Sequence, residues 1–423
     1  MESMDKNILI ISHNPLSWIN NNGKTLVSIF DGVPKENIYQ VYLNSDIPDY
    51  SKECHYLQIN EKQIISSLLK MKNLCCVEVE ADFGAVPSTT IKKRNFANHT
   101  KRFLRECVWK FGFWQKKLKE WLRDKKIDVV FFVAGDGMFA YDVYRFVMKN
   151  ISAKGCMFFT DDYIMGKSSR SPVACLRRHM LKRKISKTLS FVDELYVISD
   201  EMKDAYRALF GVDSYVIRNF SVEKKEIPAP RCSGGQSDAL TMVYAGGLHY
   251  NRWKVLSKIA MSLKEINLSG KAKCLLKIYS AQNISRKITD SITIEGASKF
   301  CGAASASQVS EIYASADILI HVESFEKSAI ASTKYSFSTK IPEYLSAGRC
   351  VLAVGPGEVA SVRYLKTFAC VVDEGEDLYN TLTKIISDDK YRELVKSECE
   401  QHYEMDFSKT KQKECLMRIL SVR

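Results

Sequence analysis

Apolar runs of strand length alternate with helix-length segments along most of the chain. Such continuous runs are typical of parallel strands that are buried on both faces of a sheet covered by helices. The pattern therefore predicts an α/β fold with two Rossmann-like domains whose parallel sheets face each other across a cleft. The expected strands lie at 7–13, 128–134, 155–160, 194–199, 241–245, 275–279, 292–295, 317–322, 350–354 and 370–372, and helical patterns follow at 376–388, 389–404 and about 408–421.

The chain has 423 residues, enough for two domains of about 200 residues each. Charged residues followed by Pro, Gly and Ser at 223–239 have the composition of a linker. We predict a first domain at 1–224, a linker at 225–239, a second domain at 240–405, and a last helix within 406–423 that can cross back. In open parallel sheets ligands bind beyond the carboxyl ends of the strands, so the loops at that edge are where functional residues are expected.

The segment 333–357 has the most informative pattern. A polar run ends at Lys340 and Pro342, a helical turn carries Glu343, and Gly348 ends that turn before an apolar strand. Proline suits the first turn of a helix and glycine suits the position after its end. A helix N-terminus beside a lysine attracts anions, and a carboxylate can accept hydrogen bonds from sugar hydroxyls. The segment predicts a site for phosphate plus ribose, as in a nucleotide-sugar.

A second candidate follows the strand at 241–245. Gly246 and Gly247 would let backbone N–H groups approach a phosphate, and Arg252 and Lys254 follow at the start of a helix. A guanidinium can make two-pronged contacts with phosphate. The alternative is a tight turn followed by solvated charges.

Several stretches together resemble the retaining family 4 of GT-B glycosyltransferases. The resemblance rests on VYAGGL with Arg252 and Lys254, SEIYASADILIHVE, STKIPEYLSAGRCVLAVGPG, and VISDEMKDAYRALFG followed by VIRNF. It is strong over 190–360 and weak before that. The resemblance implies the two-domain GT-B fold, with the donor bound by the second domain and the acceptor by the first.

The same resemblance implies roles for individual residues. Glu343 would bind the ribose, and Arg252 with Lys254 or Lys340 would hold the diphosphate and stabilise the leaving group. Glu323 would stand as the first glutamate of the family's paired-glutamate motif, near the donor sugar. The remaining donor-side candidates are Gly246, Gly247, Ser338 and Thr339. No metal or further cofactor is expected, because the resemblance implies a reaction that needs only the nucleotide-sugar.

The spacing of the two glutamates departs from the family. Nineteen residues separate Glu323 from Glu343, which is wider than the family's usual interval, and Glu326 is also too distant. A solvated loop carboxylate therefore stays an alternative reading of Glu323.

Two loops of the first half could contact donor or acceptor. The loop at 14–26 contains Asn22 and Gly23, whose backbone could approach either substrate, although Asn-Gly is also a common turn. The loop at 159–167 contains Asp161 and Asp162, and a carboxylate there could take the proton of an acceptor hydroxyl. The alternative is that one of the pair caps the next helix.

Positive charge is concentrated in the first half, although the whole chain carries +13. Segment 92–126 has a net charge of +10 and segment 167–187 has +8. Within 102–122, aromatic and basic residues are interleaved, which favours the headgroup region of an anionic membrane. The alternative is a helix that packs its apolar stripe on the core. No nucleic-acid-binding module is visible, so no nucleic-acid partner is expected.

The sequence predicts an enzyme of the bacterial cytoplasm, peripheral to the inner face of the membrane. Its thirteen cysteines form no CxxC pair, and no run of about 20 uncharged apolar residues is present. We expect transfer of a hexose-type sugar from a nucleotide diphosphate to a saccharide or polyprenyl-linked acceptor, with retention, in capsule, O-antigen or exopolysaccharide synthesis. The alternatives are a nucleotide-sugar epimerase of the same fold and a non-catalytic nucleotide-binding scaffold.

Overall fold

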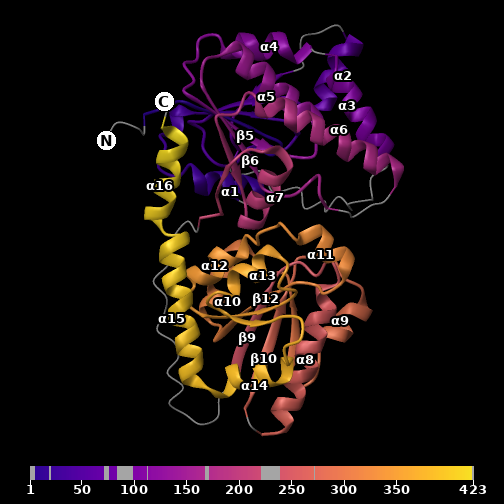
Figure 1. Ribbon diagram of the computed structural model, residues 1–423, viewed down its shortest axis with the longest axis vertical. Helices are drawn as coiled ribbons and strands as arrows, with labels where there is room; N and C mark the ends of the chain where they lie inside the picture. The colour runs from indigo at the N-terminus through magenta and orange to yellow at the C-terminus, as the bar shows by residue number, and fades with distance from the viewer. Residues whose placement is uncertain are drawn as a thin grey trace. The chain divides into compact units, whose positions relative to one another are not determined.

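The chain folds into two compact units, each built around one sheet (Figure 1). Unit 1 comprises Met1–Arg218 with Gln412–Arg423, and unit 2 comprises Asn219–Lys411. The computed structural model describes residues 5–18, 21–70, 76–82, 99–111, 113–166, 171–220, 239–270 and 272–421. All but the last residue of the expected linker at 225–239 lies outside these ranges. The α/β class is confirmed.

Unit 1 contains a sheet of eight strands among the residues described, in the order β4-β3-β2-β1-β5-β6-β7-β8. All neighbours are parallel except β3 and β4 at the edge. Its strands are β1 (Ile8–Ser12), β2 (Ile38–Tyr42), β3 (His55–Gln58), β4 (Val77–Val79), β5 (Val129–Ala134), β6 (Lys154–Phe159), β7 (Glu194–Val197) and β8 (Ser214–Val216). Its helices are α1 (Asn21–Ile29), η1 (Lys35–Asn37), α2 (Glu61–Lys70), α3 (His99–Trp109), α4 (Phe113–Leu122), α5 (Met138–Asn150), α6 (Pro172–Leu189) and α7 (Asp200–Phe210).

The helix α16 (Lys409–Leu420) packs into unit 1, although it follows unit 2 in the chain (Figure 1). The Gln412 amide donates to the backbone oxygen of Asp31 at 2.7 Å. At the other end, the Lys154 amine donates to the carbonyls of Arg418 and Ser421 at 2.8 and 2.9 Å. A buried cation at a helix C-terminus offsets the partial negative charge of the last carbonyls. These contacts fix α16 at both ends.

Unit 2 contains a six-stranded parallel sheet in the order β11-β10-β9-β12-β13-β14, again among the residues described. The neighbouring strands β12 and β13 are buried along their whole length, so both faces of this part of the sheet are covered. The strands are β9 (Leu240–Ala245), β10 (Cys274–Tyr279), β11 (Ser298–Gly302), β12 (Ile318–Val322), β13 (Cys350–Val354) and β14 (Cys370–Val372). The helices are α8 (Arg252–Leu268), α9 (Arg286–Ile292), α10 (Ala306–Ala314), α11 (Lys327–Thr333), α12 (Lys340–Ser346), α13 (Ala360–Leu365), α14 (Leu378–Ser387) and α15 (Asp389–Asp406).

The expected strand at 292–295 is wrong. Ile292 ends α9, and Ile294 lies in a tight turn where Ser298 accepts a hydrogen bond from its N–H at 2.9 Å. The strand follows as β11. The other nine expected strands match β-strands of the structure, but β2, β3, β4 and β8 were missed. In β2 the buried amide of Gln40 interrupts the apolar run, and it is satisfied by Leu16 N–H at 2.9 Å.

Candidate functional site

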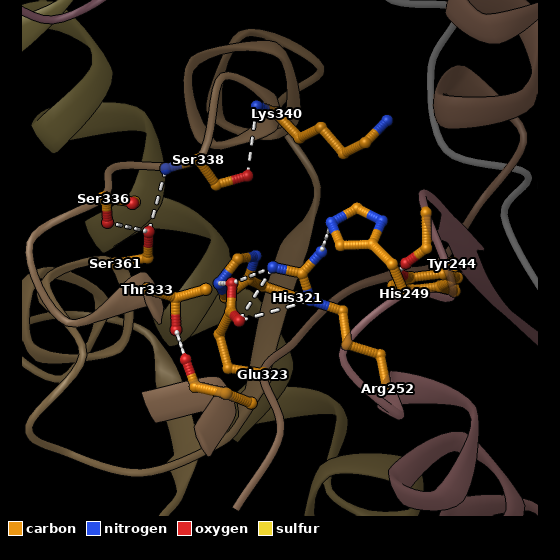
Figure 2. A network of polar contacts seen from close by, with 12 residues as sticks. Tyr244, His249, Arg252, His321, Glu323, Thr333, Ser336, Ser338, Lys340 and Ser361 are labelled. Atoms are coloured by element: carbon orange, nitrogen blue, oxygen red, sulfur yellow. Dashed lines mark hydrogen bonds and ion pairs between the residues drawn. The ribbon is translucent and has the colours of Figure 1, made fainter. Parts of the chain in front are cut away.

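A buried ion pair joins two neighbouring strand ends of unit 2 (Figure 2). Arg252 opens α8 after β9, and Glu323 is the first residue after β12. Arg252 Nη2 lies 2.8 Å from both carboxylate oxygens of Glu323, and Nε lies 3.2 Å from Oε2. Because β9 and β12 are adjacent and parallel, their carboxyl ends bring these side chains together.

Glu323 is buried and not solvated. Only 4% of its surface is exposed, so the alternative of a solvated loop carboxylate is wrong. A buried carboxylate is stable only with a well-placed partner, and the two-pronged guanidinium supplies one. Burial opposes the charge of Arg252, but the carboxylate of Glu323 outweighs that effect and raises the pKa of Arg252 above its ordinary value.

A neutral histidine lies beside this pair. His321 is in β12, two residues before Glu323 and so on the same face of the strand. Its Nε2 is 3.5 Å from Glu323 Oε1 and has no hydrogen-bond partner among the described residues. Burial, and then the charges of Arg252 and Lys340, lower the pKa of His321 to about 3. The sequence analysis missed this residue, although a histidine within the apolar run ILIHV marks a polar position inside the sheet.

The other side of Arg252 contacts a second histidine. Arg252 Nη1 lies 3.1 Å from His249 Nε2, and His249 Nδ1 lies 3.0 Å from Gln282 Nε2. The Gln282 carbonyl accepts a hydrogen bond from Leu248 N–H at 2.8 Å. Gln282 follows β10, so the polar chain from Gln282 to Glu323 crosses the ends of three adjacent strands, β10, β9 and β12.

The two glycines after β9 permit close contacts with their own neighbours. A Cβ on Gly246 would lie 2.7 Å from the Tyr244 hydroxyl, which donates to the Gly247 carbonyl at 2.7 Å. A Cβ on Gly247 would lie 2.5 Å from His249 Nδ1. The space beside both glycines is therefore taken by Tyr244 and His249. That these glycines make room for a donor stays a prediction.

The turn that leads into α8 is strained. Tyr250 and Asn251 both have positive φ, 57° and 61°, which non-glycine residues adopt at a cost of about 1–3 kcal/mol each. Asn251 does not cap the helix, because its amide donates to Glu326 at 2.7 Å. Glu326 also accepts from Lys254 at 2.7 Å. Lys254, predicted to bind diphosphate, is thus paired at the surface, and Glu326 holds the turn.

The helix α12 begins at Lys340 and has Glu343 in its first turn, as the sequence predicted. Gly348 follows its end with φ 55°. The loop before it is held by Ser338, whose N–H donates to Ser361 at 2.8 Å (Figure 2). Thr339 is exposed and makes no capping bond. The charge of Lys340 acts on His321. The structure thus brings Lys340 into the neighbourhood of the Arg252–Glu323 pair.

The first-half candidate loop packs on itself. A Cβ on Gly23 would lie 2.6 Å from the Pro15 carbonyl and 2.7 Å from Ser17 N, so glycine is required there by the loop 15–17. Asn22 is exposed in the first turn of α1. A contact of either residue with a substrate stays a prediction.

Asp162 holds its own loop together. Its carboxylate accepts hydrogen bonds from Ile164, Met165 and Gly166 N–H at 2.6–3.1 Å. The expectation that one of the aspartates caps the next helix is wrong, because Ser171 caps α6. Asp161 accepts from Asp162 N–H at 2.9 Å and is partly exposed.

Another buried carboxylate lies beyond the strand ends of unit 1. Glu106, in α3, accepts hydrogen bonds from Met138 and Phe139 N–H at 2.8 and 3.0 Å, in the first turn of α5. Arg177 of α6 lies 3.6 Å from it. Burial raises the pKa of Glu106, which these partners only partly offset. The sequence analysis gave this residue no role.

The basic aromatic segment 102–122 divides into buried and exposed residues. Phe103, Phe111 and Phe113 are exposed. The buried group comprises Trp109, Trp114, Leu118, Trp121 and Leu122. The apolar stripe therefore packs on the core, as the alternative expected, and three phenylalanines face solvent. Contact of this segment with a membrane stays a prediction. Among the described residues, no helix is both long and apolar enough to cross a bilayer.

Neither known sequence families nor curated proteins give a match to this chain. Solved structures do resemble it. Sucrose-phosphate synthase from Thermosynechococcus elongatus has a TM-score of 0.62 at 11% identity, covering 98% of this chain and 97% of that chain. The E. coli trehalose-6-phosphate protein bound with UDP-2-fluoro glucose has 0.62 at 9%, covering 99% and 100%. Anabaena HepE in complex with UDP and glucose has 0.59 at 13%, covering 98% and 99%. The chain therefore has the GT-B fold of these glycosyltransferases.

Proposed function

We propose that the protein is a glycosyltransferase that moves a sugar from a nucleotide diphosphate sugar to a saccharide acceptor. The observation that carries this proposal is the buried Arg252–Glu323 pair at the carboxyl edge of the unit 2 sheet. Charged groups are costly to bury, and a fold that retains them at its ligand-binding edge usually does so for function. The GT-B neighbours with bound UDP or a UDP-sugar support the same class of donor.

In this proposal different residues of unit 2 bind different parts of the donor. Arg252 and Lys340 supply positive charge for the diphosphate, which becomes more negative as the sugar leaves. Glu343 accepts the ribose hydroxyls. Glu323 holds Arg252 instead of contacting the sugar directly, because the guanidinium occupies both of its oxygens. Lys254 contributes less, since Glu326 neutralises it.

The finer features of the reaction also belong to the proposal. We place the enzyme in retaining family 4, acting without a metal in bacterial surface polysaccharide synthesis on a lipid-linked acceptor. Asp161 is the carboxylate proposed to meet the acceptor hydroxyl. Full activity in EDTA would support a metal-free reaction, and the anomeric configuration of the product, read by NMR, would decide retention.

The proposed lipid-linked acceptor predicts attachment to an anionic membrane surface. Phe103, Phe111 and Phe113 are exposed among basic residues, and α6 adds the exposed side chains of Val173 and Leu176. Vesicles containing phosphatidylglycerol should bind the protein, whereas phosphatidylcholine vesicles should not. Replacing Phe111 and Phe113 by serine should weaken that binding, and equal binding by the variant would contradict this surface.

The decisive test of the function is nucleotide binding. Thermal unfolding is followed with UDP, GDP, CMP and their sugar conjugates for the wild type, Glu343→Ala and the control Glu295→Ala. Glu295 precedes β11 at the opposite edge of the sheet and is exposed. A ligand at 100 times its Kd stabilises by about 2.7 kcal/mol.

We expect one diphosphate family to raise the melting temperature of wild type and Glu295→Ala but not of Glu343→Ala. Absence of any shift in the wild type would reject the donor site and favour a scaffold. Turnover of the donor without any acceptor would favour an epimerase.

A further inference from the structure

The turn that leads into α8 would not keep its shape on local preference alone. Tyr250 and Asn251 both have left-handed backbone conformations, with φ of 57° and 61°. Residues other than glycine disfavour this conformation because their Cβ crowds the following carbonyl oxygen. Asparagine adopts it as a single residue, but a bulky tyrosine rarely does. Two such residues in succession are therefore held in place by contacts from outside the turn.

Those contacts come from Glu326, the residue that precedes α11. The Asn251 amide donates to Glu326 Oε2 at 2.7 Å, and the Lys254 amine donates to Oε1 at 2.7 Å. The other side of the Asn251 amide accepts from Trp253 Nε1 at 3.2 Å. The carboxylate thus holds the first turn of α8 at two positions, and Arg252 lies between them.

The backbone of Glu326 is itself fixed by the core of unit 2. Its carbonyl accepts hydrogen bonds from the N–H groups of Ala329 and Ile330, both at 2.9 Å, where α11 begins. Ile330 is buried and packs with Val359 and Val362. The carboxylate that holds the turn therefore starts from a rigid part of the sheet's helical cover.

We propose that Glu326 is a positioning residue of the donor site, which keeps the turn at Tyr250–Asn251 left-handed and so keeps Arg252 where it binds the diphosphate. This inference rests on the proposed function and adds to it a residue that acts without touching the substrate. Glu323 fixes the guanidinium at the end of the side chain, whereas Glu326 fixes the backbone from which that side chain starts. Without Glu326 the turn would relax toward negative φ, and fewer molecules would have Arg252 in place.

The sign of the effect separates positioning from a plain effect of charge. Glu326 is an anion that neutralises Lys254, so on charge alone Glu326→Ala should bind a diphosphate more tightly than the wild type. Positioning predicts the opposite, because apparent affinity falls with the fraction of binding-competent molecules. We expect Glu326→Ala to bind UDP or GDP about tenfold more weakly, the factor that corresponds to one residue's preference against left-handed backbone.

Glu326→Gln separates the hydrogen bond from the charge. It removes the same negative charge as Glu326→Ala but keeps an oxygen that can accept from Asn251. We therefore expect it to bind the diphosphate at least as tightly as the wild type. Because the Glu326 side chain is 40% exposed, neither replacement should unfold the protein.

Position 250 provides a rescue experiment. Glycine adopts positive φ as readily as negative φ, so Tyr250→Gly removes the tendency of the turn to relax. Combined with Glu326→Ala, it should recover most of the lost affinity. Tyr250→Ala removes the same ring but still disfavours positive φ, so it should recover none. Calorimetric titration with UDP and GDP measures each variant, and Glu393→Ala, which removes a surface partner of Lys396 in α15, is the control.

The outcomes separate this inference from the function on which it rests. Equal or tighter diphosphate binding by Glu326→Ala overturns the positioning role and leaves the transferase proposal standing. Glu326→Gln binding as weakly as Glu326→Ala also overturns it. The same follows if Tyr250→Gly and Tyr250→Ala restore affinity equally or not at all, because backbone strain would then not be the cause. A wild type that binds no diphosphate rejects both proposals together.

Discussion

Two buried glutamates lie beyond the strand ends of the two sheets, and their partners differ. Glu106 in unit 1 is held by two backbone N–H groups of α5, with Arg177 nearby. Glu323 in unit 2 is held by the side chain of Arg252. Backbone donors in a helix cannot leave their acceptor without unravelling a turn, whereas a guanidinium can share its other edge with a ligand. The partner therefore distinguishes a glutamate that stabilises a fold from one that positions a binding group.

Replacing Glu323 by alanine is expected to lower the stability of the protein more than any other change to these two glutamates. It leaves Arg252 largely buried without its partner, which should lower the free energy of unfolding by about 3–5 kcal/mol. Diphosphate binding should fall as well, because the guanidinium loses its orientation. Urea denaturation and nucleotide titration measure the two effects. An unchanged urea midpoint would mean that the pair contributes nothing to the fold.

The acid sensitivity of unit 2 provides the second test. His321 has a folded-state pKa of about 3, below its unfolded value of about 6.5. Between these values the unfolded state binds more protons, so acid destabilises the folded state. Between pH 6.5 and 4.5 this group alone should cost about 2.3 kcal/mol of folding stability. The variant His321→Gln should lose less stability over that interval, and identical pH profiles would contradict a neutral buried imidazole.

Glu106→Ala should lower stability without weakening diphosphate binding, and its loss of stability should be smaller than that of Glu323→Ala. It leaves two N–H groups of α5 without their acceptor, which should cost about 2 kcal/mol of stability. Diphosphate affinity should stay that of the wild type, because Glu106 belongs to unit 1 and accepts hydrogen bonds from the backbone of α5. If Glu106→Ala weakened diphosphate binding as much as Glu323→Ala, the distinction between the two glutamates would be lost.

The sequence predicted those parts of the molecule that depend on local pattern. The central strands and the Lys340–Glu343 helix followed from apolar runs and from the positions of Pro342 and Gly348. Strand β2 was missed because Gln40 is buried and polar, and its partners Ser12 and Leu16 come from the end of β1 and the loop that follows it.

The contacts of the candidate site required knowledge of strand order. Arg252 and Glu323 are 71 positions apart, and they meet only because β9 and β12 are neighbours in the sheet. His321 reads as one more residue of an apolar strand until its neighbours Arg252 and Lys340 are known. No spacing rule along the chain would have paired His249 with Gln282.

The attachment of α16 to unit 1 has a consequence for protein synthesis. A ribosome delivers Met1–Arg218 first, then all of unit 2, and only afterwards the residues from Gln412 onward that complete unit 1. Until then the backbone oxygen of Asp31 and the amine of Lys154 lack the partners that α16 gives them. Unit 2 is continuous in sequence and can finish folding during translation. The unit that is made first is therefore the one that is finished last.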